Sequence, residues 1–479
     1  MSISVVTKHD FGKGFQRLDA EFVEASVLYE EQVIRREFVG SKLQSQVENE
    51  LSGRVQSGEL KRKLEADGCV RYIAIDSVDT ADGLSFETEY FDLEDLPSRA
   101  TYDLEARDII VSNVRPNRGA MALVRADQVG AIASSGFTLL RLAKDPAGPT
   151  PEYLFALLKS RVYRDQLIRR SRGSMFPAVV RSDIVDLYIP RLSKAAENKV
   201  FKLVSRAVEL HSEFFELKKK SRELLENFLA PIGSPPSPMT TRKQGVDSTI
   251  SSAKAFFSPE GAQRIDAEFF RGEYAEFDKR CIAQGETFNL GDWFDLNPGR
   301  ALSASSKSTP YAKQGILTNV GINWSALEET DGSIPSGGWR VQNDDILLAC
   351  TAHEIAYIGR KVDLVTEVPE WAEGNVGCVP DLMIIRKKKD SPPLSLHYLA
   401  AFLRHPAGLH QVQRCIRGLR GGHVYRKDLS KYVRVPVPSK HWMTNFDEIE
   451  SAAERTRNLA KSIMADAVTI IDEIIQAKL

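Results

Sequence analysis

Cysteine is scarce in this chain of 479 residues, and its spacing follows no metal-binding or redox motif. None of the five cysteines stands in a Cys-x-x-Cys pair. This odd, scattered set predicts free thiols in a reducing cytoplasm rather than a disulfide framework. Six of the eight histidines lie in the second half, but no two have the His-x-x-x-His spacing of a usual zinc site. We therefore expect polar or partly buried histidines and no bound metal.

Long apolar runs and cofactor-binding motifs are missing as well. No apolar run approaches the ~18 residues that a membrane span needs, and the N-terminus has no apolar core of a secretory signal. There is no Gly-x-x-x-x-Gly-Lys-Ser/Thr loop, no Gly-x-Gly-x-x-Gly after a strand and no Asn/Asp-Pro-Pro-aromatic tetrapeptide. The sequence thus predicts a cytoplasmic chain without a cofactor, which neither methylates, cleaves nor hydrolyses ATP by itself.

An excess of positive charge is also absent. Lys and Arg number 64 against 65 Asp and Glu, so the net charge is −1. An anionic partner must therefore be bound by a local basic surface. With 42% hydrophobic and 27% charged residues, the composition is that of a globular protein with real cores.

One short motif is present twice. Residues 14–22 read GFQRLDAEF and residues 261–269 read GAQRIDAEF, a spacing of 261 − 14 = 247 residues. This period is too long for a solenoid, whose units run ~20–50 residues, and indicates a domain-sized duplication. The acidic residues of the motif are either catalytic or paired locally to fix a helix to its domain; exact duplication favours the second reading. They are Asp19, Glu21, Asp266 and Glu268.

Further landmarks recur at nearly the same offset, so the duplication covers the whole half. Strands are predicted where short β-branched and aromatic runs end at Gly, Pro or Asp, and helices where apolar residues recur every three to four positions. Opening helices are expected at 16–36 and 263–280, and a strand at 69–75. The matched pairs are the strands 107–114 and 343–350, the strands 130–141 and 379–386, the helices 151–168 and 397–405, and the loops 169–190 and 417–438.

Each half ends in a long helix, at 194–230 and 445–478. The first has an apolar seam of alternating three- and four-residue steps in which Ser221 is the only polar member, and the second interleaves Ala with Ile. Large against small residues let two helices approach closely, so we expect an antiparallel coiled coil about 50 Å long. The seams are Val200, Leu203, Ala207, Leu210, Phe214, Leu217, Ser221, Leu224 and Phe228, and Ile449, Ala453, Thr456, Ala460, Ile463, Ala467, Ile470 and Ile474.

The sequence therefore predicts an α+β protein with two duplicated mixed domains, separated by two long antiparallel helices and related by a pseudo-two-fold axis. The expected boundaries are 1–193 and 261–440 for the domains, 194–230 and 441–479 for the helices, and 231–260 for a linker rich in Pro and Ser.

Basic residues surround a glycine in the loop that closes each half. They either contact phosphates and base edges or form a solvated turn; their matched placement favours contact. A second pair of loops, 112–119 and 349–360, offers Arg and Asn, which suit guanine and adenine edges, as well as His353 and Tyr357. The candidate DNA contacts are Arg115, Asn117, Arg118, Arg169, Arg172, Ser174, Arg181, His353, Arg417, Arg420, His423 and Arg426.

Taken in this order, the QR-[LI]-DAEF motif, the basic glycine loop, the Pro-ended strand and the long helix resemble the specificity (S) subunit of type I restriction–modification systems over nearly the whole chain. The resemblance implies two target recognition domains, each reading one half of an asymmetric, interrupted site in double-stranded DNA. It also implies that the paired helices set the spacing and dock two methyltransferase (M) subunits, which bring S-adenosylmethionine. Restriction (R) subunits would add cleavage that depends on ATP and Mg.

One function from another class competes with this reading: a scaffold or anti-restriction protein that keeps the paired helices but binds proteins instead of DNA. A self-contained modification enzyme is disfavoured by the missing motifs. The charged outer faces of the helices, at 218–223 and 454–457, are either the M-subunit dock or a solvated surface.

Overall fold

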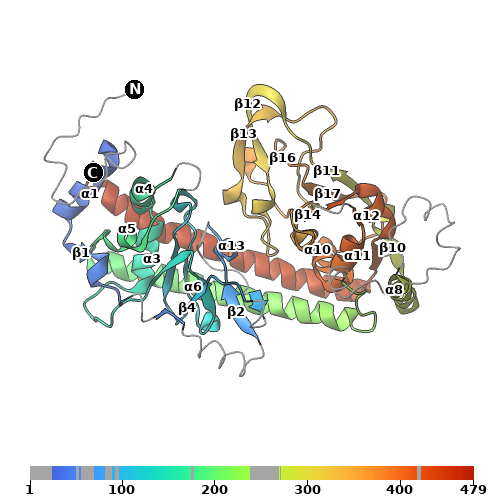
Figure 1. Cartoon of the computed structure of the whole chain (residues 1–479), viewed down its shortest axis with the longest axis horizontal. Coiled ribbons are helices and arrows are strands. Elements are labelled where there is room, and N and C mark those ends of the chain that lie inside the picture. Colours follow the sequence, from blue (N-terminus) through green and yellow to red (C-terminus); the bar gives the residue numbers. More distant parts are fainter. Residues whose placement is uncertain are drawn as a thin grey trace. The chain divides into compact units, whose positions relative to one another are not determined.

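Figure 1 shows the computed structural model of the chain. It describes residues 24–49, 53–55, 69–80, 83, 89–91, 96–173, 177–237, 269, 271–417 and 422–479. Both copies of the repeated motif lie outside the described residues except for Phe269, as do Ser174, Arg420 and most of the expected linker. The described chain is α+β, with long helices and mainly antiparallel sheets.

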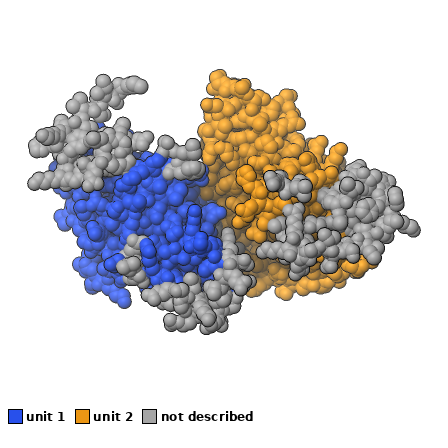
Figure 2. Space-filling model, in the orientation of Figure 1, with its two compact units in different colours: residues 1–215, 454–479 blue, residues 216–453 orange. Residues whose placement is uncertain are grey.

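The chain divides into two compact units (Figure 2). Unit 1 comprises residues 1–215 and 454–479, and unit 2 comprises residues 216–453. The two long helices, α6 (Lys194–Leu229) and α13 (Lys440–Gln476), each contribute one part to each unit. This division differs from the one expected from sequence, in which the helices stand apart from the two domains.

Unit 1 begins with α1 (Ala25–Glu37), followed by β1 (Gly40–Lys42), which pairs with β9 (Tyr188–Pro190). One sheet has the order β3-β2-β7-β4, with β2 and β7 parallel; a second, antiparallel sheet has the order β6-β5-β8. The strands are β2 (Val70–Ile73), β3 (Glu89–Phe91), β4 (Ala100–Asp103), β5 (Ile109–Ser112), β6 (Met121–Leu123), β7 (Ile132–Ser134) and β8 (Phe137–Leu140). The helices that follow are α3 (Pro151–Lys159), α4 (Arg161–Arg170) and α5 (Arg181–Val185).

Unit 2 contains α8 (Gly272–Gln284), followed by β10 (Thr287–Asn289), which pairs with β20 (Arg434–Pro436). Its sheets have the orders β11-β17-β14-β15, β13-β12-β16 and β18-β19, with β12 and β16 parallel. The strands are β11 (Phe294–Pro298), β12 (Ser303–Ala312), β13 (Glu328–Ser333), β14 (Ile346–Ala349), β15 (Val362–Leu364), β16 (Gly377–Cys378), β17 (Leu382–Lys387), β18 (Ile416–Arg417) and β19 (His423–Val424). The short helices are α9 (Leu290–Trp293), α10 (Leu396–Arg404), α11 (Pro406–Arg414) and α12 (Arg426–Tyr432).

Two expected elements of unit 1 are each interrupted. The strand expected at 130–141 is two strands, β7 and β8, with a turn at 135–136. The helix expected at 151–168 is two helices, because Ser160 adopts an extended conformation (φ −61°, ψ 154°) and its Oγ donates to the carbonyl of Leu157. Ser160 is also the N-cap of α4, a position where serine is favoured. The break lets both helices contribute to one core.

The buried faces of the long helices match the expected seams in part. In α6, Val200, Ala207, Leu210, Phe214 and Ser221 are buried as expected, but Val204, Leu225 and Leu229 are buried in place of Leu203, Leu224 and Phe228. In α13, Ala453, Ala460 and Ala467 are buried as expected, and, Phe446 aside, the other buried positions lie one residue later than expected. The buried residues are Val200, Val204, Ala207, Leu210, His211, Phe214, Ser221, Leu225 and Leu229 of α6, and Phe446, Glu450, Ala453, Arg457, Ala460, Met464, Ala467, Ile471 and Ile475 of α13. Ser221 is therefore not the only polar member, and the expectation that it is was wrong.

Candidate nucleic-acid interface

The basic glycine loop of unit 2 is held in shape by its own ion pair. Arg417, at the end of β18, donates from Nε and Nη2 to the two carboxylate oxygens of Asp428, at 2.7 and 2.8 Å. Asp428 lies buried in the first turn of α12. The Arg417 guanidinium is also 5.8 Å from the ring centroid of Tyr425. The pair thus ties the hairpin to the helix that follows.

The loop of unit 1 carries the same pair, 245 residues earlier. Arg172 donates to both carboxylate oxygens of Asp183, with Nη2 at 3.1 Å from Oδ1. Arg172 and Ala178 exchange two backbone hydrogen bonds, and the backbone N–H of Val180 donates to Asp183 at 3.0 Å. Arg172 and Arg417 were expected to contact DNA, but in each unit the guanidinium is engaged by a carboxylate of its own loop.

In unit 2, an imidazole and an aromatic ring lie side by side where β19 leads into α12. His423 hydrogen-bonds through Nδ1 with the hydroxyl of Thr351, and its ring meets Tyr425 edge-on at 4.7 Å and 72°. Tyr425 is 51% exposed at the N-cap of α12, and Arg426 beside it is also exposed. The contacts predicted from the sequence include His423 and Arg426 but not Tyr425, although the sequence places this aromatic residue between them.

The second pair of candidate loops lies beside the first pair. In unit 1, Val114 forms a β-bridge with Ala178, and the backbone N–H of Arg115 donates to the carbonyl of Pro177 at 2.6 Å. In unit 2, Thr351 bridges to His423 in the same way. The two candidate sets predicted from sequence therefore meet within each unit.

The remaining candidates of these loops lie at the surface. Arg115 has a left-handed conformation (φ 51°) at the start of a 3-10 turn, Pro116–Arg118, whose Asn117 and Arg118 are exposed. In unit 2, His353 is exposed. So is Tyr357, whose ring lies 5.4 Å from the Arg360 guanidinium. Both loops can thus present polar side chains to a ligand.

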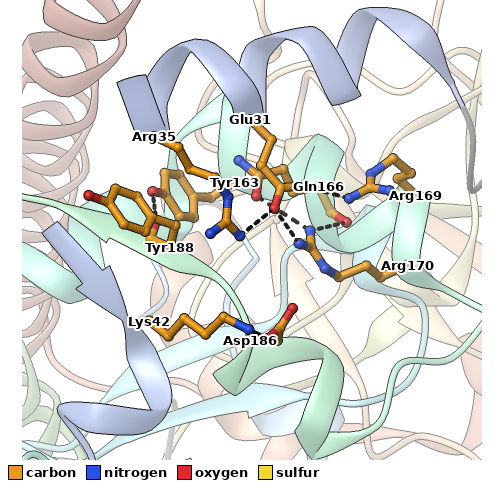
Figure 3. Close-up of polar contacts among 9 residues, drawn as sticks. All are labelled: Glu31, Arg35, Lys42, Tyr163, Gln166, Arg169, Arg170, Asp186 and Tyr188. Carbon is orange, nitrogen blue, oxygen red and sulfur yellow. Dashed lines mark hydrogen bonds and ion pairs between the residues drawn. The ribbon is translucent and has the colours of Figure 1, made fainter. Parts of the chain in front are cut away.

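Arg169 is not part of this surface. Its side chain is 3% exposed and donates to Glu31 of α1 at 2.6 Å, while Arg170 donates to the same carboxylate at 3.0 Å (Figure 3). Burial raises the pKa of Glu31, but Arg170, Arg35 and Arg169 lower it by more, so the carboxylate is held in its charged form. Arg169 packs α4 against α1, and the expected DNA contact is corrected accordingly.

Arg181 is likewise used inside unit 1. Its guanidinium donates to the carbonyl of Leu139 on β8 and, at 3.2 Å, to the carbonyl of Glu48. It therefore anchors the start of α5 to the sheet, and its place among the expected DNA contacts is corrected too. The charge pattern of the sequence could not reveal either partner, because both lie far away along the chain.

In the described ranges, no group of three or more His, Cys, Asp or Glu side chains could hold a metal ion. Burial raises the pKa of the Cys281 and Cys350 thiols to about 12, which keeps them protonated and unreactive. Among the described helices, none combines the length and the apolar character required to cross a bilayer.

No family model matches the chain. The type I restriction enzyme HindI specificity subunit of Haemophilus influenzae is 22% identical over 151 residues, which make up 31% of this chain and 32% of that protein. The chain thus spans about a third of the length of the curated relative that it matches. That relative is a specificity subunit of the kind that the repeated motifs indicated, so the resemblance is confirmed.

Two solved structures are similar over most of the chain. The HsdS subunit from Thermoanaerobacter tengcongensis is 18% identical with a TM-score of 0.33, covering 92% of this chain and 97% of that one. The S subunit of a type I restriction–modification system from M. genitalium is 13% identical with a TM-score of 0.36, covering 92% and 95%. These TM-scores are low, so the two structures support no argument about the arrangement of the chain.

Proposed function

We propose that this chain is the DNA-specificity subunit of a type I restriction–modification complex. Each unit reads one half of a bipartite, asymmetric site in double-stranded DNA. One observation carries the proposal: both units build the same surface loop on the same Arg–Asp pair, yet display different side chains on it. A shared frame with different tips is what two readers of unlike half-sites require.

The proposal includes duplication of the two halves, which is supported by contacts that recur at matched residues. Tyr153 donates its hydroxyl to the carbonyl of Pro190 at 2.7 Å, and Tyr398 donates to the carbonyl of Pro436 at 2.6 Å. These pairs are offset by 245 and 246 residues. Identical contacts between residues far apart along each half are hard to explain by similar composition alone.

A second matched contact is an ion pair that joins two neighbouring strands in each unit, β5 with β8 and β14 with β17. Arg141 donates twice to the buried Asp108, and Arg386 donates twice to the buried Asp345. The residue before each aspartate, Arg107 or Asp344, adopts a positive φ, 70° or 68°. Residues other than glycine rarely adopt a positive φ, so its recurrence at matched positions supports common descent of the halves.

The long helices serve as an antiparallel coiled-coil spacer in this proposal. Two contacts support the antiparallel direction: within unit 1 the Arg457 guanidinium lies 5.9 Å from the ring centroid of Phe214, and within unit 2 Lys218 pairs with Glu450 at 2.6 Å. As the residue number increases along α6, the number of the contacting residue on α13 decreases. We further infer that the exposed outer faces dock two M subunits.

In this complex the chain itself is non-catalytic and cytoplasmic. The M subunits bring S-adenosylmethionine, and R subunits, where the host has them, bring ATP-dependent cleavage. The chain supplies sequence recognition and fixed spacing, so that two weakly discriminating heads act at a high effective concentration.

The test is to express the chain together with an amino-methyltransferase and sequence the modified bases of the host DNA. We expect methylated adenines in a two-part motif. Replacing residues 261–436 with the corresponding domain of another such chain should change one half of that motif only. No motif at all, together with stable binding of protein partners, would instead support the competing scaffold or anti-restriction function.

A further inference from the structure

The Arg–Asp frame presents one residue in particular to solvent. In unit 1 this residue is Val180, which is 49% exposed at the N-cap of α5. In unit 2 it is Tyr425, 51% exposed at the N-cap of α12. The two positions are 245 residues apart, the same offset as the Arg–Asp pairs that hold them.

Single exposed apolar residues are common on protein surfaces and need no function. Here, however, the same position is exposed and apolar in both units, next to a helix start that is fixed by a buried or half-buried aspartate. The residue two places earlier, Ala178 or His423, differs between the units as well, and these two positions are called the tip residues of each unit. The frame is therefore shared, while the two tip residues differ.

The tip of unit 2 is held rigidly although it is exposed. The hydroxyl of Thr351 fixes the His423 ring, which packs edge-on against Tyr425. The Arg417 guanidinium also contacts the Tyr425 ring. In unit 1 the matched positions are Val180 and Ala178, and Ala178 is bridged to Val114. A side chain that is already fixed loses little conformational entropy on binding.

We propose that Val180 and Tyr425, with Ala178 and His423 behind them, are specificity-determining contacts to base edges in the two half-sites. This inference rests on the proposed function. Valine can offer only an apolar contact, such as one to the methyl group of thymine. Tyrosine with its adjacent imidazole adds hydrogen-bonding groups and an aromatic face, so the two half-sites differ in the kind of base edge read here.

The test uses the full chain bound to its methyltransferase partner and a random-sequence pool of duplex DNA. The variant Tyr425→Val installs the unit 1 residue in unit 2, and Tyr425→Phe removes only the hydroxyl. The matched control is Trp371→Val, which removes another aromatic side chain of unit 2 that is 63% exposed. Thermal unfolding of each variant verifies that the fold is retained.

We expect Tyr425→Val to change the base preference at one or two positions of a single half of the motif, by roughly tenfold or more. Val180→Tyr should change the other half. Trp371→Val should recover the original motif. An unchanged motif with Tyr425→Val, or equal weakening of binding to all sequences, would overturn the inference.

Failure of the proposed function and failure of the tip-residue assignment give different results. If the unaltered complex enriches no two-part motif, the proposed function is wrong, whatever the variants do. If it enriches such a motif and the tip variants leave both halves unchanged, only the assignment of the tip residues is wrong.

Discussion

Arg417 and Asp428 form a two-hydrogen-bond ion pair across eleven residues, at 2.7 and 2.8 Å. Arg172 and Asp183 repeat it in the other unit. In each pair the carboxylate engages two N–H donors of the guanidinium and fixes its position in the loop. We therefore assign the two arginines to shaping the loop, and leave direct contact to side chains such as Arg426 that project from it.

This assignment predicts an unusual result for Asp428→Asn. Removing a negative charge near DNA should tighten binding if Arg417 contacts phosphate, because the arginine is then released. A framing role predicts weaker specific binding, by about tenfold, since the loop loses a charge-assisted pair. The dissociation constant for the recognised duplex, measured over a range of salt concentrations, separates the two outcomes.

Arg426→Gln is the matched comparison for that measurement. Loss of one phosphate contact lowers the slope of log binding constant against log salt by about one. Asp428→Asn should leave this slope unchanged while affinity falls. Tighter binding with Asp428→Asn would show that Arg417 is a direct contact after all.

The two buried tyrosine hydroxyls give a test of the duplication. Tyr153→Phe and Tyr398→Phe each leave a carbonyl, of Pro190 or Pro436, without its tyrosine donor. Each should destabilise its own unit by about 1–1.5 kcal/mol. Native-state hydrogen exchange can follow the units separately, and Tyr29→Phe, at an exposed position, should have no measurable effect. If only one of the two variants lowered the stability of its unit, the two tyrosines would not have equivalent roles.

The recurring sequence offset predicted much of the fold. Strands β5, β8, β14 and β17 and the long helices lie where apolar periodicity and Pro or Gly boundaries placed them. The phase of the helix seams could not be predicted as well, because apolar residues occupy adjacent positions, as with Leu203 and Val204. Only packing in the folded chain decides which of the two is buried. Packing also buries charged residues of α13, namely Glu450 and Arg457.

The candidate site was harder to predict than the fold. A run of arginines looks like a basic surface until its partners are known. Glu31 is 138 residues from Arg169 along the chain, and the carbonyl of Glu48 is 133 residues from Arg181. Sequence alone carries no signal for such long-range pairing. It did place the loops at matched positions, and the exposed Tyr425 between two candidates could have been found there.

Thiol reactivity gives an independent measure of the unit 2 core. Four of the five cysteines are buried, and only Cys69 is half-buried. Burial keeps the Cys281 and Cys350 thiols protonated at pH 8, with pKa values of about 12. A thiol-specific reagent at pH 8 should therefore modify at most one cysteine of the native chain and all five after unfolding. Rapid native modification of two or more would contradict the described core.

The pairing of the long helices is tested by Lys218 and Glu450, which are both largely buried within unit 2. Lys218→Met alone leaves the Glu450 carboxylate buried without its cation, so we expect a loss of about 3–5 kcal/mol in the free energy of unfolding. Lys218→Met combined with Glu450→Leu should restore most of that loss, because both charges are then removed. Denaturant unfolding of the single and double variants measures the coupling, and Arg206→Ala, which breaks an exposed pair, should cost less than about 1 kcal/mol.

The same pair predicts the sign of a pH effect. Burial raises the pKa of Glu450, but Lys218, the Ser221 hydroxyl and Arg404 together lower it by more, so its pKa in the folded chain lies below the ordinary value of 4.5. A carboxyl whose pKa is lowered by folding stabilises the fold above its unfolded pKa, and this contribution is lost as pH falls through the folded value. Acid should therefore destabilise the unaltered chain more steeply below about pH 4.5 than the double variant, which lacks the titrating group. Equal acid sensitivity of the two proteins would mean that Glu450 gains nothing from Lys218, and that the pair does not determine how α6 and α13 are matched.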